Sequence, residues 1–299
     1  MKKMYMLCIW SLLLLLAACG SDHLTIEVEK DLYFQKDKPS AFAIKVKDKD
    51  GTVQDLKIDA TFAMTNMDHG KEEVTFTEQG EGVYTTEVQL PMAGKWEIVF
   101  TIDQDGKTIE KVMEYEVKEP SGVAMINGEW VTNEDIEFYR FINDLHISIS
   151  REKDKAQYQG KELEEKLAYW DDQEKLVQDQ NQLLTQIIRL HSMALLGEEK
   201  GHKATNEEVK TEVDNVRKQY EEYKVAKDMI QDYGEEKFWD KEKKQYELIV
   251  LSQKVQNDLI SQVKKENPDV NQQEILYLAQ KKYEELLVSQ VNSLDIEIM

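Results

Sequence analysis

The sequence predicts a multidomain α+β protein in which a β-rich part precedes a mainly α-helical one. Three observations lead to this prediction. The chain begins with basic and then apolar residues, and residues 24–118 alternate between apolar and polar side chains. From residue 132 onward, apolar side chains recur every three or four positions. A period of two is typical of half-buried strands, and a period of 3.6 is typical of amphipathic helices.

The N-terminus has the layout of a secretory signal. Two lysines precede an apolar run over residues 4–16, which is short for a membrane-spanning helix. The run ends in Leu16-Ala17-Ala18-Cys19, which resembles a bacterial lipobox, where a diacylglycerol is attached to the cysteine and the chain is cut before it. We therefore expect residues 1–18 to be a lipoprotein signal peptide and residues 19–23 a tether lipidated at Cys19. An ordinary cleaved signal that ends in cysteine is the alternative.

The charge and the cysteines exclude several classes of partner and site. The chain has 38 basic and 59 acidic side chains and a net charge of −21, which repels nucleic acid. The same charge opposes electrostatic binding to anionic lipids, so the acyl chains on Cys19 have to anchor the protein to the membrane. The only other cysteine, Cys8, lies in the signal. The mature chain is therefore expected to have no disulfide, thiol redox site or cysteine-ligated metal.

Residues 24–118 predict an immunoglobulin-like β-sandwich. Alternating runs such as 42–47 and 83–88 are separated by turn signals that contain glycine. Asp105-Gly106 lies between two of these runs, which predicts a hairpin at that point. Roughly seven short strands in a segment of this length are typical of two packed antiparallel sheets.

Residues 119–122 are the predicted linker, and residues 123–299 predict a helical domain. The expected helical segments include 162–198 and 235–265. Helix N-caps, each with an acidic residue three positions later, are expected at Thr132, Thr205 and Asn271.

The two ends of the helical domain are expected to meet in a small sheet. Residues 294–299 return to apolar-polar alternation, which predicts a strand. Its expected partner is the short apolar segment 123–126. This pairing would tie the C-terminus of the domain to its beginning.

The helical half resembles the SurA/PrsA-type exported chaperones. The resemblance begins with Val123-Ala124-Met125-Ile126-Asn127-Gly128-Glu129-Trp130-Val131-Thr132, which is similar to the small hairpin before the first helix of that family. It continues in Gly201-His202-Lys203-Ala204-Thr205, a glycine and short linker before a capped helix. The parvulin-type prolyl isomerase domain of SurA and PrsA has no counterpart of suitable length. The resemblance therefore implies a SurA N-terminal-like domain that binds unfolded or assembling exported proteins without isomerase activity.

Such a domain would offer clients an apolar groove between its helices. The alternative is that the same side chains form the core of the domain, since an amphipathic stripe needs burial in either case. The candidate groove residues are Phe138, Phe141, Leu145, Trp170, Tyr220, Tyr223, Phe238 and Trp239.

The β-rich half resembles the YtkA/FixH-like family of small exported or membrane-tethered sandwiches. The resemblance lies in Met64-Thr65-Asn66-Met67-Asp68-His69, Gly80-Glu81-Gly82-Val83-Tyr84 and Pro91-Met92-Ala93-Gly94-Lys95-Trp96, in the order of that family. FixH-type proteins are linked to copper handling in oxidase assembly, and thioether and imidazole groups suit Cu(I). The candidate ligands are Met64, Met67, His69 and Met92. The alternative places Met64 in the core and the others in plain turns.

The sequence contains no motif for catalysis. His146, His191 and His202 occur singly in helical segments, and no catalytic triad order or phosphate-binding glycine loop is present. We therefore expect a lipid-anchored protein on the extracytoplasmic face of the cell membrane that acts as a non-catalytic chaperone or assembly factor. The alternative function is a copper-binding metallochaperone for oxidase assembly.

Overall fold

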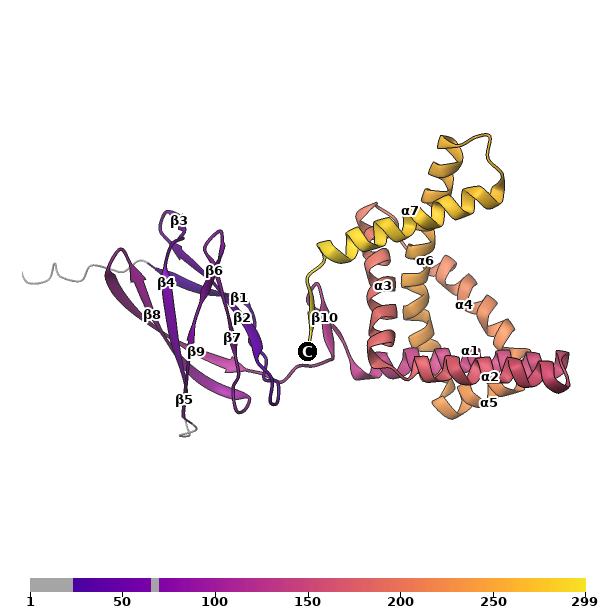
Figure 1. Cartoon of the computed structure of the whole chain (residues 1–299), viewed down its shortest axis with the longest axis horizontal. Helices are drawn as coiled ribbons and strands as arrows, with labels where there is room; N and C mark the ends of the chain where they lie inside the picture. The colour runs from indigo at the N-terminus through magenta and orange to yellow at the C-terminus, as the bar shows by residue number, and fades with distance from the viewer. Residues whose placement is uncertain (1–23, 66–69) are drawn as a thin grey trace, which may run out of the picture. The chain divides into compact units, whose positions relative to one another are not determined.

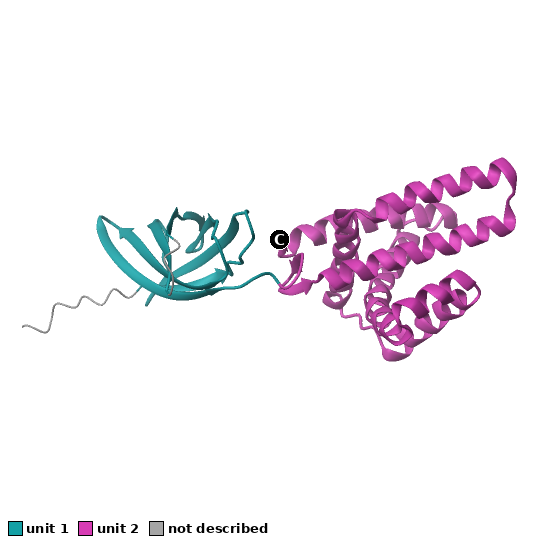
Figure 2. Cartoon of the chain, turned by 90° about the horizontal axis from the view of Figure 1, so that it is seen from below, with its two compact units in different colours: residues 1–120 teal, residues 121–299 magenta. Residues whose placement is uncertain are grey.

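The computed structural model describes residues 24–65 and 70–299 and divides the chain into two compact units (Figures 1 and 2). The first unit extends to Pro120 and the second comprises Ser121–Met299. This boundary falls inside the segment 119–122. Cys19, Met67 and His69 lie outside the described residues.

The first unit consists of two antiparallel sheets. One has the order β1-β2-β7-β6 with β3 paired to β2, and the other has the order β5-β4-β8-β9 (Figure 1). Among the described residues this gives nine strands, more than the seven that the turn signals suggest. The strands are β1 (Thr25–Lys30), β2 (Ser40–Asp48), β3 (Gly51–Thr52), β4 (Lys57–Met64), β5 (Lys71–Thr75), β6 (Thr77–Gly80), β7 (Val83–Val88), β8 (Gly94–Gln104) and β9 (Lys107–Val117).

The hairpin expected at Asp105-Gly106 is confirmed. Strands β8 and β9 pair from Gly94 opposite Val117 to Gln104 opposite Lys107, which leaves a two-residue turn. Asp105 and Gly106 have positive φ angles of 52° and 79°. Positive φ at both positions is typical of the type I′ turn, whose twist matches that of the strands it joins.

Aromatic side chains from both sheets fill the interior of the sandwich. Phe42 of β2 meets Phe62 of β4 across the sheets with ring centroids 6.1 Å apart, and both are fully buried. The buried Tyr84 donates its hydroxyl proton to the Val53 carbonyl at 3.0 Å and accepts from the Leu56 N–H at 3.2 Å. The alternating strand pattern thus gives a closed core in which the tyrosine hydroxyl is hydrogen-bonded.

The second unit combines a three-stranded sheet with seven helices. The sheet contains β10 (Ala124–Ile126), β11 (Glu129–Val131) and β12 (Ile296–Ile298). The helices are α1 (Asn133–Gln157), α2 (Gly160–Val177), α3 (Gln180–Glu199), α4 (Asn206–Glu221), α5 (Lys224–Tyr233), α6 (Glu235–Glu266) and α7 (Gln272–Ser293).

The predicted pairing of the two ends of this unit is confirmed. Strand β12 is antiparallel to β10, with Ala124 opposite Ile298 and Ile126 opposite Ile296. The expected caps are also confirmed: Thr132 and Thr205 form capping boxes, and the Asn271 side chain accepts the Glu274 N–H. Local sequence therefore determines where these helices begin.

The single helical segment expected over 162–198 is wrong. Helix α2 ends at Val177 and α3 begins at Gln180, because the Asp179 carboxylate caps α3 by accepting the Asn181 N–H at 2.8 Å. Helix α2 has no buried residue, whereas α3 has eight, so the break separates a surface helix from a core helix.

Helices α3 and α6 approach each other closely at Gly197. A Cβ atom at this position would lie 3.1 Å from the Leu251 carbonyl oxygen, so only glycine permits this spacing without a shift of the backbone. This contact sets the distance between α3 and α6 at Gly197. No helix within residues 24–65 and 70–299 is long and apolar enough to span a membrane.

Candidate functional site

The helical unit contains a pocket of about 200 Å³ beside His191. Its walls come from β11, α1, α3 and α6 and include Trp130, Tyr139, Ile187 and Gln245. A second pocket of about 220 Å³ is also lined by His191, together with Ile126, Asn127 and Leu195. His191 and Leu248 line both pockets, which are therefore neighbours, and we call the two together the His191 site.

Helical spacing explains how the sequence builds this site. Ile187, His191 and Leu195 follow one another at intervals of four on α3, and therefore occupy one face of that helix. Lys241, Gln245 and Leu248 do the same on α6 at intervals of four and three. The β10–β11 hairpin closes one end, because Ala124, Ile126 and Val131 are buried in the same cluster as Ile187.

Two polar atoms in the walls of this site are buried without a hydrogen-bond partner among the described residues. They are the Tyr139 hydroxyl and the Gln245 Oε1. Burial raises the pKa of Tyr139, so its hydroxyl stays protonated and remains a donor. An unsatisfied buried polar group costs about 1–3 kcal/mol, so each of these two atoms needs a partner that the described residues do not supply.

His191 contributes a third polar group to the site. Its imidazole forms no hydrogen bond to any residue that the structure describes, and burial lowers its pKa, so the ring is neutral at pH 7. Lys241 at the rim is held 3.7 Å from Glu134 and 3.5 Å from Asp135, and its charge is therefore already compensated. The site thus combines neutral hydrogen-bonding groups and apolar walls with charged side chains: Asp135, Lys241 and Lys244 line the first pocket, and Glu129 and Glu198 line the second.

This arrangement matches the chemistry of a peptide segment. Gln245 Oε1 can accept a backbone N–H, and the Tyr139 hydroxyl can donate to a backbone carbonyl. Ile187 and Leu248 offer apolar contact to a side chain. Each of the two pockets, at about 200 and 220 Å³, lies below the range of about 300–1,000 Å³ typical of whole small-molecule sites and would hold one side chain with its peptide group.

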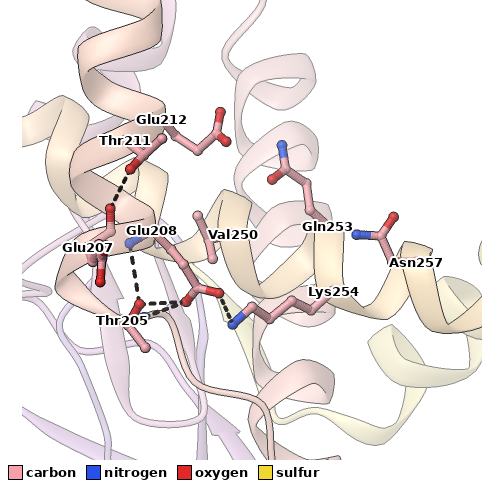
Figure 3. A pocket seen from close by; sticks show the side chains of 9 residues that line it. All are labelled: Thr205, Glu207, Glu208, Thr211, Glu212, Val250, Gln253, Lys254 and Asn257. Carbon is pink, nitrogen blue, oxygen red and sulfur yellow. Dashed lines mark hydrogen bonds and ion pairs between the residues drawn. The ribbon is translucent and has the colours of Figure 1, made fainter.

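A further pocket of the helical unit is of a different kind (Figure 3). It measures about 570 Å³ and lies between α4 and α6. Glu208 accepts a hydrogen bond from Lys254 at 2.7 Å and two more from Thr205 at its N–H and hydroxyl. The bond from Lys254 and those from Thr205 lower the pKa of Glu208 to about 2. Glu208 and Lys254 thus form an ion pair that joins the start of α4 to α6.

A buried chain of titratable groups lies deeper in the helical unit. The His146 Nε2 is 2.9 Å from the Tyr220 hydroxyl, which donates to Glu242 Oε1 at 3.4 Å. Burial raises the pKa of Glu242 to about 7 and lowers that of His146. These groups come from three helices, α1, α4 and α6, and no pattern in the sequence links them.

Most of the predicted groove residues lie inside the helical core. Phe138, Leu145, Tyr220 and Phe238 are at most 4% exposed and belong to one cluster. Against this cluster pack the partly buried Phe141, Tyr223 and Trp239. In this conformation, these side chains stabilise the packing of α1, α4, α5 and α6, and of the seven only Phe138 also reaches the His191 site.

Trp170 lies apart from that cluster. Its indole N–H donates to Asp154 Oδ2 at 2.7 Å, which ties α2 to α1. Its ring meets that of Tyr169 edge-on, at 4.9 Å between the centroids. The structure therefore brings seven of the eight predicted residues together and leaves this one on the surface helix.

The described part of the predicted copper site comprises Met64 and Met92. Met64 packs partly buried against the core of the sandwich. Its Cε lies 3.1 Å from the position that a Cβ on Gly94 would take, two residues beyond Met92. Among the described residues, no three His, Cys, Asp or Glu side chains are grouped so that they could hold a metal ion.

Comparison with known protein families gives a match in the first part of the chain. Residues 20–101 match the YtkA-like family, which confirms that part of the resemblance seen in the sequence. No curated protein matches the chain.

Three solved structures show distant similarity. An engineered protein is 11% identical with a TM-score of 0.24, over 31% of this chain and 20% of its own. The endo-β-1,4-mannanase from Thermotoga petrophila is 19% identical with a TM-score of 0.22, over 34% of this chain and 22% of its own. The PKD domain of human SorCS2 is 12% identical with a TM-score of 0.20, over 33% of this chain and 75% of its own. The chain thus spans about a fifth of the length of the first two proteins.

Proposed function

We propose that the protein is a lipid-anchored extracytoplasmic chaperone or assembly factor that binds exported or membrane proteins without catalysing a reaction. The observation that carries this proposal is the His191 site, where two unpartnered buried polar atoms lie in apolar walls. The resemblance of residues 123–132 to the opening hairpin of SurA/PrsA-type chaperones supports it, because that hairpin forms one wall of the site.

The His191 site would hold an unfolded segment through one peptide group and one apolar side chain. The peptide N–H would donate to Gln245, and the carbonyl would accept from Tyr139. Both interactions are independent of the sequence of the client, as a chaperone requires. The apolar walls would then select segments that are exposed only in unfolded chains.

An aggregation assay tests this function. A soluble form spanning residues 21–299 should suppress precipitation of an unfolded exported protein at near-stoichiometric ratios. Leu248→Lys, which places a charge in the His191 site, should remove most of the suppression. Leu276→Lys is the matched control, because Leu276 on α7 is already 46% exposed and lies outside the site. Equal loss in both variants, or suppression unchanged by Leu248→Lys, would contradict the assignment. A prolyl isomerase assay should show no turnover.

The lipid anchor is tested separately. Metabolic labelling with a palmitate analogue should mark the full-length protein, because the sequence around Cys19 resembles a lipobox. Cys19→Ser should abolish the label and release the protein from the membrane fraction. Label retained on the variant would contradict lipidation at this residue.

Copper handling is the second candidate function. It is favoured by the position of the Met64 methyl group beside Gly94, close in sequence to Met92. Titration with Cu(I) against a competing chelator should give one-to-one binding in the wild-type chain and none in a Met64→Leu/Met92→Leu variant. Leucine preserves the apolar volume and removes the thioether. If the wild-type chain binds no Cu(I) above background, copper handling is contradicted.

A further inference from the structure

One arginine of the chain lacks the ion pair that all the others have. The sequence contains four arginines, all in the helical unit. Arg140 pairs with Glu137, Arg151 with Asp171 and Glu174, and Arg189 with Glu284. Arg217 pairs with no carboxylate among the described residues, although the net charge of the chain is −21.

Arg217 is held in place by an aromatic ring instead. The centre of its guanidinium lies 4.2 Å from the centroid of Trp239, a cation–π contact between α4 and α6. Its Nε is buried and has no hydrogen-bond acceptor among the described residues. A stacked guanidinium is already oriented, so a ligand that binds it orders few additional rotamers.

Arg217 and Trp239 line a pocket of about 420 Å³ between α4, α5 and α6. Its apolar walls include Ile230, and a second cation, Lys227, stands at its exposed rim without an ion pair among the described residues. No residue of this pocket is shared with the His191 site.

We propose that this pocket binds the C-terminal carboxylate of a peptide whose last side chain is apolar. A carboxylate matches the fork of donors on a guanidinium and would satisfy the buried Nε or the terminal nitrogens of Arg217. The apolar side chain on the same terminal residue would pack on Trp239 and Ile230. A chain end carries both groups on one residue.

The acidic rim of the pocket favours a chain end over an acidic segment. Glu221 and Glu235 line the pocket beside Arg217 and are exposed. A peptide with several carboxylates would be repelled by these two groups and by the net charge of the chain. A single terminal carboxylate meets the one unpaired arginine and brings no further negative charge. The proposed chaperone function needs only apolar segments, so recognition of chain ends goes beyond it.

Binding of matched peptides tests this inference. The probe is a fluorescein-labelled apolar hexapeptide ending in leucine, used as the free acid and as the C-terminal amide, with anisotropy measured on the soluble chain 21–299. The free acid should bind at least about tenfold more tightly, as expected for a charge-assisted bidentate hydrogen bond. Attraction by the whole protein cannot produce this preference, because an acidic protein repels the free acid more than the amide.

Substitutions at Arg217 should remove the preference. Arg217→Gln should make the acid and the amide bind equally, and Arg217→Lys should retain only part of the difference because lysine lacks the planar fork. Arg189→Gln is the control: it changes the net charge equally, breaks the pair with Glu284 and should leave the acid-to-amide ratio unchanged. If Arg217→Gln unfolds, as judged by its thermal transition, Arg217→Lys supplies the test.

Three results would overturn the inference. They are equal binding of acid and amide to the wild-type chain, a preference that persists in both Arg217 variants, and equally tight binding of an amidated peptide with one internal glutamate. Suppression of aggregation without any preference for the free acid would refute recognition of chain ends and leave the proposed chaperone function intact. The reverse result would refute the chaperone function alone.

Discussion

Replacing the buried Glu242 with glutamine should stabilise the protein in a pH-dependent way. Glu242 is 2% exposed on α6, and its hydrogen-bond partner is the Tyr220 hydroxyl at 3.4 Å. No described cation forms an ion pair with it. Burial therefore dominates and raises the pKa of Glu242 to about 7 from 4.5.

The size and sign of the effect follow from this difference in pKa. Between pH 4.5 and 7 the folded protein keeps the proton of Glu242, whereas the unfolded chain has lost it. The folded state then binds more protons, so its stability falls as the pH rises through this window. At about 1.4 kcal/mol per pKa unit the loss amounts to about 3 kcal/mol, present in full above pH 7. Glutamine has a similar shape, still hydrogen-bonds to Tyr220 and does not ionise.

Urea unfolding of both proteins between pH 4.5 and 8.5 measures the effect. Glu242→Gln should be within about 1 kcal/mol of the wild type at pH 4.5 and more stable by about 2–3 kcal/mol at pH 8. Glu247→Gln, at a partly exposed position of the same helix, is the control for the loss of one carboxylate. Parallel stability curves for Glu242→Gln and the wild type would refute the reasoning.

Substitutions at two glycines and at Thr132, and a truncation of the C-terminus, test how local geometry contributes to stability. Gly82→Ala should destabilise the chain by about 2–3 kcal/mol in thermal or urea unfolding, because φ is 75° and the new Cβ would lie 2.8 Å from the Cβ of Thr52. Gly106→Ala, with φ of 79° and no atom within 4 Å, should lose only about 1 kcal/mol, and equal losses at the two glycines would contradict a steric cause. Removing residues 294–299 should lower the stability of the helical unit by about 2–3 kcal/mol, because the β12–β10 pairing is lost. An unchanged midpoint of urea unfolding would contradict this expectation. Thr132→Ala should lose about 1 kcal/mol by breaking the capping box of α1, and Thr132→Ser should restore most of it.

Much of the fold could be predicted because its signals are local. The alternation over residues 24–118 predicts a two-sheet architecture, and Asp105-Gly106 predicts the β8–β9 turn through the φ angles that its residues tolerate. The pairing of residues 294–299 with 123–126 is long-range. It was still predictable, because the alternating segment 294–299 and the short apolar segment 123–126, at the two ends of a helical domain, each need a partner strand.

The break between α2 and α3 was missed because the helical spacing of apolar residues continues through it. The available signal was Asp179, a good N-cap residue followed by Gln180 and Asn181. Apolar periodicity does not tell a core helix from a surface helix, and so the pattern gave no reason to divide the segment.

The His191 site was beyond reach of the sequence for a different reason. Each of its polar groups looks ordinary alone, and His191 is a single histidine in a helical segment. Tyr139, His191 and Gln245 come from three helices that are separated in the chain, and only tertiary packing brings them to one pocket. The eight predicted groove residues, seven aromatic ones and Leu145, were in contrast visible from the sequence, and seven of the eight side chains pack in one cluster of the structure.

The distribution of unpartnered polar atoms separates the roles of the two units. In the described part of the sandwich, Tyr84 and Tyr115 hydrogen-bond to nearby backbone and to Asp31, and Trp96 Nε1 is the one buried side-chain polar atom without a partner. The helical unit has five such atoms, including those of Tyr139, Arg217 and Gln245. Folding alone favours satisfaction of these groups, because each costs about 1–3 kcal/mol when left unpaired. Three of the five, those of Tyr139, Gln245 and Arg217, belong to residues that line two pockets, whereas those of Arg140 and Asp144 do not. These three atoms make the helical unit the part of the chain where partners are expected to bind.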